Sequence, residues 1–271
     1  MTSVTTRRPG AAGLSARHYR FRHAARMEWI KLRTLRSTWW TLAITAAGTV
    51  SIAVAVGLNT RSASEDLTNN ALAGIVPGLL LVGVLGVLTM SSEYTSGMIR
   101  ATLAAVPRRP LALAAKAAVF GVLALAVGEA ASFASFFADG LALRPGITPP
   151  SLSQPGVLRA VVLAGAGFCL IGLLGLGLGS IIRHTSAAIA VLVAGVYIAA
   201  QFVGFLAHGA LAYMPILIVA NSLSSTKPLS CAAQATQCPH FLSAWAGLAV
   251  LAGYSAVVLL AGGWLLARRD A

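Results

Sequence analysis

Long, uninterrupted blocks of apolar residues dominate the pattern of this chain. Six of them reach about 20 residues, the length that a helix needs to cross the hydrocarbon core of a bilayer. They are Trp39–Leu58, Ala71–Met90, Ala117–Ala138, Val161–Ile182, Ala187–Ala207 and Trp245–Leu266. A transmembrane β-barrel would show shorter segments that alternate between apolar and polar residues, and these blocks do not alternate. The pattern predicts an all-α integral membrane protein whose six transmembrane helices form one domain, residues 37–271.

The segment before the first block divides into two parts. Residues 1–16 are small, polar and basic, which predicts a disordered cytoplasmic tail. In residues 17–36, apolar positions recur at helical spacing between basic flanks that include Lys31 and Arg33. The apolar positions are Phe21, Ala25, Trp29, Leu32 and Leu35. This pattern is typical of an amphipathic interfacial helix that lies along the inner membrane surface.

Glu28 lies in the middle of the apolar face of this helix, where a lone carboxylate is costly. Two kinds of partner would offset that cost. One is a local pair with Lys31, and the other is a basic residue elsewhere in the protein. The sequence leaves both open.

Composition agrees with a membrane protein and accounts for the net charge. Apolar residues make up 57% of the chain and charged residues 10%, whereas soluble domains carry about a quarter charged residues. This excludes a water-soluble enzyme core. The formal charge is +13, and with the N-terminus inside, 16 of the 20 Lys and Arg residues face the cytoplasm. The charge is therefore explained by topology and lipid headgroups, without nucleic acid. We expect a cell (plasma) membrane protein with both termini cytoplasmic.

The longest inner connection, residues 91–110, has the most marked sequence character. Anchoring at lipid headgroups would explain the basic residues at its end and at the start of the third span, Arg108, Arg109 and Lys116. It does not explain Glu93, Gly97 or Pro107.

The outer loop 208–244 contains an apolar run, Leu211 to Leu223, that is too short to span a bilayer. With Pro215 near its start, the run predicts a re-entrant or interfacial segment before the last span. Cys231 and Cys238 follow it, in a compartment that permits disulfides, and we favour a disulfide over free thiols. A metal site with His240 is a more distant alternative.

Glu129 lies near the midpoint of the third span, where an ionised side chain costs about 2.5–3.5 kcal/mol or more. Beside it, Gly121, Gly128, Ser132 and Ser135 form a stripe of small residues at helical spacing. Such a stripe predicts close packing against another helix. Glu129 is then either an interhelical hydrogen-bonding group or part of a substrate path.

The sequence lacks the motifs of catalysis. It contains no GxxxxGK[ST] loop and no HExxH, and Glu129 is the one acid that the pattern places at membrane depth. We therefore expect no catalytic residue, no metal site and no cofactor bound by this chain. Energy for an uphill task would come from a partner or an ion gradient.

Three stretches together resemble a known family. The inner loop reads Glu93-Tyr-Thr-Ser-Gly97-Met-Ile-Arg100, followed by Pro107, Arg108, Arg109 and Lys116. It resembles the corresponding loop in membrane subunits of ATP-binding-cassette (ABC) transporters of the exporter-like type-2 class, which have the G-type transmembrane fold. Upstream, Glu28-Trp-Ile-Lys31-Leu-Arg33 resembles their connecting helix, and Tyr213 to Leu223 their outer re-entrant piece.

The resemblance implies a permease subunit that exports an amphipathic compound such as a drug, a lipid or a peptide antibiotic. Two copies would pair as a homodimer or heterodimer, and separate cytosolic ATPase subunits would bind ATP and Mg. Glu93 and Arg100 would make polar contacts to the ATPase, and Gly97 would allow its close approach. Pro107, Arg108 and Arg109 would complete this coupling loop.

Two other hypotheses come from different classes. One is a membrane anchor or sensory protein without transport, and the other is an ion-gradient-driven carrier centred on Glu129.

Overall fold

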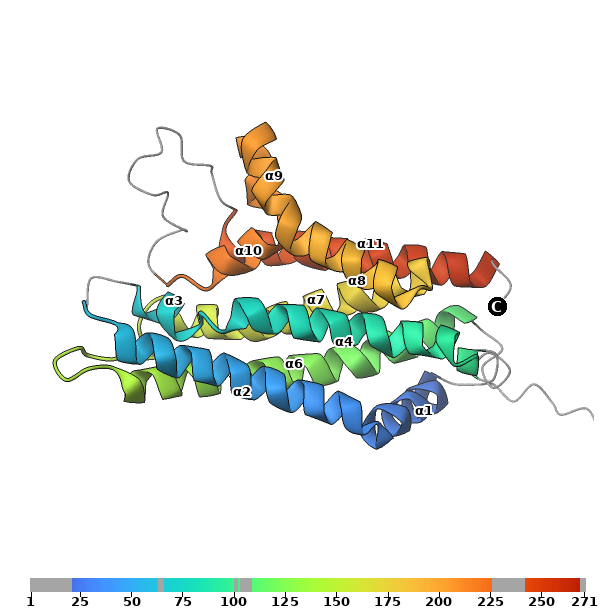
Figure 1. Ribbon diagram of the computed structural model, residues 1–271, viewed down its shortest axis with the longest axis horizontal. Coiled ribbons are helices and arrows are strands. Elements are labelled where there is room, and N and C mark those ends of the chain that lie inside the picture. Colours follow the sequence, from blue (N-terminus) through green and yellow to red (C-terminus); the bar gives the residue numbers. More distant parts are fainter. Residues whose placement is uncertain (1–20, 63–65, 100–101, 103–108, 226–241, 269–271) are drawn as a thin grey trace, which may run out of the picture.

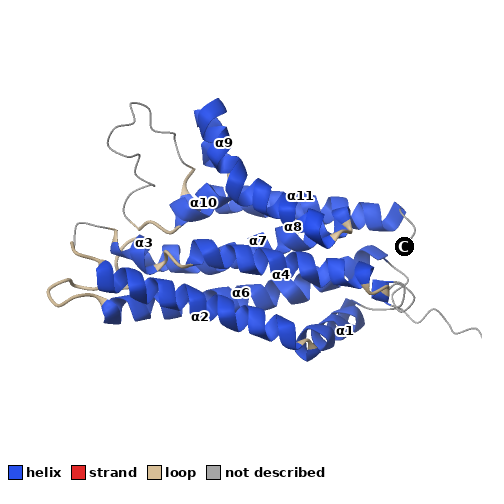
Figure 2. Cartoon of the chain, viewed as in Figure 1, coloured by secondary structure: helices blue, strands red, loops and turns tan. Residues whose placement is uncertain are grey.

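The computed structural model describes residues 21–62, 66–99, 102, 109–225 and 242–268. Helices and short connections make up all of these residues, with no strand among them (Figure 2). The longer helices are α1 (Phe21–Thr34), α2 (Arg36–Asn59), α4 (Ile75–Thr95), α6 (Arg109–Ala142), α7 (Val157–Ile182) and α11 (Ala244–Arg268). The shorter elements are α3 (Leu67–Ala71), α8 (Thr185–Val193), the π-helix η1 (Ala194–Ile198), α9 (Ala199–Leu206), the 3₁₀-helix η2 (His208–Tyr213) and α10 (Pro215–Ser222).

Six helical stretches in the described part are long and apolar enough to cross a membrane. They are Arg36–Asn59, Leu67–Thr95, Arg109–Ala142, Val157–Ile182, Thr185–Val203 and Ala244–Arg268. Each contains most or all of one predicted apolar block, so the prediction of an all-α, multi-pass membrane protein is confirmed.

The third span continues well beyond its apolar block. The block runs from Ala117 to Ala138, whereas α6 runs from Arg109 to Ala142. Its 34 residues extend about 51 Å at 1.5 Å per residue, more than the thickness of about 30 Å of a hydrocarbon core. The extensions bring Arg109, Lys116 and Asp139 into the helix, and of these Lys116 and Asp139 are buried.

The α7 helix lies at the centre of the bundle, in contact with α4, α6 and α11, and α2 packs across α6 and α4 (Figure 1). Glycines let α4 and α7 approach closely. A Cβ added to Gly86 would overlap the carbonyl oxygen of Gly172, and one added to Gly175 would overlap that of Gly83. Such contacts suit helices in a membrane, where small residues let dispersion forces act between backbones.

The predicted packing of the small-residue stripe on α6 is confirmed. Gly128 packs against Gly165 and Phe168 of α7, and Gly121 packs against Leu173 of the same helix. Ser132 and Ser135 are fully buried.

The N-terminal helix α1 packs on α6 through Ala24, Glu28 and Leu32. Phe21 and Trp29 of the same helix are exposed. The apolar pattern alone does not reveal which residues of α1 face the protein, because Ala24 is small and Glu28 is charged. The membrane position of α1 stays a prediction.

The fifth span is not one continuous α-helix. The π-helix η1 interrupts it, and α9 turns away from the line of α8 (Figure 1). The apolar run that precedes the last span forms η2 and α10, with Pro215 at the start of α10. Its re-entrant position stays a prediction, and Cys231 and Cys238 lie outside the described residues.

Candidate functional site

Four charged residues from three helices meet inside one end of the bundle. Glu28 and Lys31 come from α1, one helical turn apart, so that both reach the same side of the helix. Glu93 comes from the last turns of α4, and Lys116 from the first turns of α6. We call these four residues the charge cluster. Glu28, Glu93 and Lys116 are 2%, 5% and 6% exposed.

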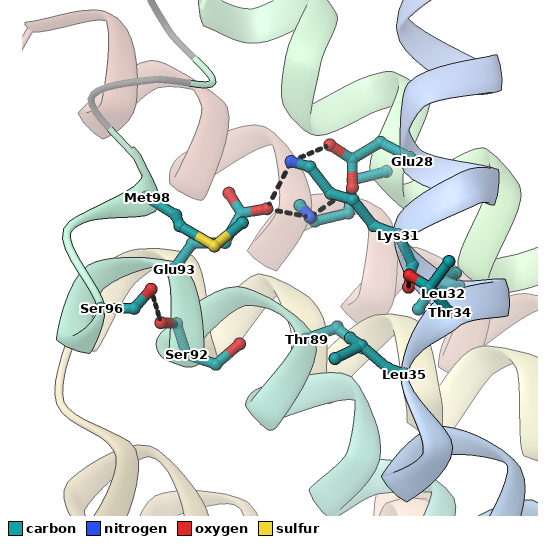
Figure 3. Close-up of a pocket in the computed structure, with 11 residues that line it drawn as sticks. Glu28, Lys31, Leu32, Thr34, Leu35, Thr89, Ser92, Glu93, Ser96 and Met98 are labelled. Atoms are coloured by element: carbon teal, nitrogen blue, oxygen red, sulfur yellow. Dashed lines mark hydrogen bonds and ion pairs between the residues drawn. The ribbon is translucent and has the colours of Figure 1, made fainter.

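Each lysine of the charge cluster bridges both glutamates (Figure 3). The Lys31 Nζ donates to Glu28 Oε1 at 3.0 Å and to Glu93 Oε1 at 2.8 Å. Its third hydrogen bond goes to Thr102 Oγ1 at 3.0 Å, which uses all the donors of the ammonium group. The Lys116 Nζ donates to Glu93 Oε1 at 2.8 Å and to Glu28 Oε2.

The opposite charges stabilise one another in a place that excludes most solvent. Burial lowers the pKa of the Lys31 amine, but the hydrogen bond and charge of Glu93 and the charge of Glu28 outweigh it. The pKa is therefore raised above its ordinary value. Two ammonium and two carboxylate groups also cancel in formal charge, so the cluster fixes three helices together without leaving net charge in the interior.

A cavity of about 340 Å³ lies beside the charge cluster. Its apolar wall includes Leu32 of α1, Leu35, which precedes α2, and Met98 of the segment after α4. All four residues of the charge cluster also line it (Figure 3). One buried acceptor here, Glu93 Oε2, has no hydrogen-bond partner in the described part of the chain. The cavity therefore combines an apolar wall with the charged side chains of the cluster.

The structure decides where Glu28 finds its partner. Both alternatives from the sequence hold at once, because Lys31 pairs with one carboxylate oxygen and Lys116 with the other. Lys116 is buried in this ion pair, so the headgroup-anchor interpretation is wrong for that residue. The sequence pattern could not show this, since Lys116 precedes an apolar block just as an interfacial anchor would.

Glu93 also differs from its expected place. A direct polar contact to an ATPase requires a side chain at the surface, whereas Glu93 is buried and its Oε1 accepts from both lysines. Gly97 follows the end of α4 with a φ of 70°, and no atom of the described residues lies within 4 Å of an added Cβ. Its conformation therefore calls for glycine, and the structure shows no tight packing there.

Three further predicted site residues, Arg109, Trp29 and Arg33, belong to α6 and α1. Arg109 begins α6, and its guanidinium donates to the Leu266 carbonyl oxygen at 3.4 Å. Trp29 and Arg33 are exposed on α1. Arg100, Pro107 and Arg108 lie outside the described residues.

Glu129 lies apart from the charge cluster. Its half-buried carboxyl group packs over Gly165 of α7 and makes no hydrogen bond with any residue that the structure describes. The predicted role as an interhelical hydrogen-bonding group is therefore not seen in those residues. The Ser132 hydroxyl donates to the Glu129 backbone carbonyl at 3.0 Å.

The sequence analysis missed a second acid on α6, Asp139. It is fully buried near the far end of α6, where it packs against Gly57 of α2. Neither carboxylate oxygen has a hydrogen-bond partner within the described ranges. The apolar block ends one residue earlier, at Ala138, although nothing in Asp139-Gly-Leu-Ala142 requires the helix to stop there. Continuing the predicted helix past Ala138 would have included Asp139 in it.

Comparison of the chain with models of known protein families and with curated proteins finds no significant match.

Proposed function

We propose that this multi-pass membrane protein is the permease subunit of an ATP-driven ABC transporter of the exporter-like type-2 class. The observation that carries the proposal is the charge cluster, because it ties α1, the end of α4 and the start of α6 into one unit. The resemblance of residues 93–100 and 28–33 to that class supports it. Six membrane-spanning helices supply the necessary scaffold.

In this proposal, a separate cytosolic ATPase docks at the end of the bundle that holds the charge cluster. The connection from α4 to α6 begins beside Glu93, so force on it passes directly to both helices and, through Lys31, to α1. The ATPase favours one state of the permease only if its contacts differ between two states. ATP and Mg stay on the partner, and a second permease copy completes the path for an amphipathic compound.

A charge-reversal series tests the coupling role. Glu93→Lys places three ammonium groups around Glu28, and we expect it to separate ATP hydrolysis from transport in vesicles that contain both subunits. The exchange variant Glu93→Lys/Lys116→Glu restores the pairing of opposite charges and should recover part of the coupling. Thr95→Lys is the matched control, since it adds the same charge at an exposed position two residues further along.

Normal hydrolysis and transport by Glu93→Lys would show that the charge cluster has no coupling role. If affinity purification of the intact chain retrieves no cytosolic ATPase, and transport is unchanged when the gene is deleted, the permease proposal itself fails. A membrane anchor would then be the better description.

The two acids of α6 favour a second candidate, an ion-gradient-driven carrier. Intramembrane acids commonly mark ion paths, and Asp139 is a further, fully buried acid on the helix that carries Glu129. The two side chains face different neighbours, however, since Glu129 packs on α7 and Asp139 on α2. Loss of pH-dependent flux in Glu129→Gln and Asp139→Asn, with no need for ATP, would select this candidate over the ABC permease.

A further inference from the structure

We propose that Glu129 forms a binding site for a lipophilic organic cation, a compound whose positive charge is surrounded by apolar groups and carries few or no N–H bonds. Binding is a property of this chain alone. That such a cation is also the transported compound rests on the proposed function.

The carboxyl group of Glu129 is accessible and unpaired. It makes no hydrogen bond or ion pair with any residue that the structure describes. The residue is half-buried, and its two oxygens are not shielded from the surroundings, whereas both oxygens of Asp139 on the same helix are. A ligand can therefore reach the Glu129 carboxyl group directly. An acid within a membrane span that has no partner in its own chain is a candidate ligand-binding group.

The contact between α6 and α7 positions this carboxyl group. The side chain of Glu129 lies over Gly165 of α7, and a Cβ added at Gly165 would overlap the carboxyl carbon. The polar neighbour one turn along α6, Ser132, donates its hydroxyl to the Glu129 backbone carbonyl at 3.0 Å. Glycine thus leaves room for the carboxyl group, and neither residue supplies a donor to it.

The neighbours of Glu129 along α6 are apolar. Positions three and four apart lie next to each other on a helix surface. One turn on either side of Glu129 are the exposed Leu125 and the partly buried Phe133, and Val122 beyond Leu125 is also exposed. The apolar groups of a ligand can pack on these side chains. Phe133 also brings an aromatic ring to this neighbourhood, and aromatic rings attract cations.

These surroundings favour a lipophilic cation over other positive ligands. Ca²⁺ and Mg²⁺ take six or more oxygen ligands, and the carboxyl group offers two. A primary ammonium group has three N–H donors, and donors left unpaired in an apolar place are costly. A quaternary ammonium or phosphonium centre has no such donors, so charge attraction and apolar contact are enough to bind it.

Equilibrium dialysis of the purified full chain in detergent, with labelled tetraphenylphosphonium, measures the binding. Tetraphenylborate has the same four rings and the opposite charge. Glu129→Gln removes the charge and keeps the shape. We expect it to weaken phosphonium binding about tenfold, between the values for an exposed and a buried ion pair. Tetraphenylborate binding should stay the same or increase, which separates the charge of Glu129 from partitioning into detergent.

Two further variants locate the site. Ala134→Gln adds the same amide side chain at an exposed position of α6 and should leave phosphonium binding unchanged. Phe133→Leu keeps an apolar side chain but removes the ring, and should weaken phosphonium binding about twofold to fivefold. It also tests the site if Glu129→Gln does not fold.

Unchanged phosphonium binding in Glu129→Gln or in Phe133→Leu would overturn the proposal. So would an equal loss of tetraphenylborate binding in Glu129→Gln, because the site would then recognise apolar surface and not charge. No ATPase is present in these measurements. Failure of the intact chain to retrieve an ATPase would refute the permease and leave the binding result standing, whereas failure to bind the phosphonium ion would leave the permease proposal untouched.

Discussion

Replacing Lys116 by methionine tests whether the charge cluster holds this end of the bundle together. Methionine keeps most of the volume of the side chain and removes its charge. Glu28 then keeps Lys31 alone, and Glu93 loses one of its two donors. Both carboxylates stay buried.

The expected cost follows from the burial of the site. Removing one partner from a buried ion pair destabilises a protein by about 3–5 kcal/mol, and Lys116 is 6% exposed. The same change at Lys31, whose side chain is 25% exposed, should cost less, about 1–3 kcal/mol. The structure thus predicts the size of the stability loss for each variant and predicts that Lys116→Met loses more than Lys31→Met.

Unfolding in mixed micelles, with sodium dodecyl sulfate added stepwise and helicity followed by circular dichroism, gives these free energies. Arg33→Met is the matched control, because it removes an exposed cation from α1 and should change the free energy by less than about 0.5 kcal/mol. Replacing all four residues of the charge cluster by apolar residues of similar volume should restore much of the loss, since no charge is then left unpaired.

A loss below about 1 kcal/mol for Lys116→Met would refute the reasoning. So would a larger loss for Lys31→Met than for Lys116→Met. Either result would mean that the buried carboxylates do not depend on Lys116 for their stability.

Three further predictions concern stability. Folding raises the pKa of Lys31, so its contribution to the free energy of unfolding is complete below the unfolded pKa of about 10.4 and is lost as the pH rises through the folded pKa. Between pH 9 and 12, the free energy of unfolding should therefore decline more in the wild type than in Lys31→Met. Gly86→Ala forces a Cβ onto the Gly172 carbonyl and should cost about 1–3 kcal/mol in the same micelle titration. In the control Gly253→Ala, the added Cβ meets no atom of the described residues within 4 Å, and the change should be neutral or stabilising by up to about 1 kcal/mol. Asp139→Ala removes a buried, unpartnered carboxyl group and should stabilise the bundle by about 1 kcal/mol; a clear loss instead would reveal a bound water or ion and favour the carrier.

The apolar blocks were enough to predict all six spans, because burying about 20 apolar residues in hydrocarbon requires no knowledge of the neighbouring helices. The same local logic located the small-residue face of the third span, although it did not say which helix packs against it. It could not place the ends of α6, because a helix leaves the hydrocarbon without a change in its hydrogen bonding. Asp139 was missed for that reason.

The charge cluster shows the opposite case. Glu28 was identified as costly, and Glu93 and Lys116 stood out as separate features, but nothing in the spacing links the local pair Glu28 and Lys31 to Glu93 or Lys116. Residues so far apart in the chain meet only when α1 packs on α6 and the end of α4 brings Glu93 beside both helices. The sequence by itself determined the number and nature of the helices, since apolar length is a local property. Only the tertiary structure decided which charges neutralise one another, because an ion pair depends on distance in space.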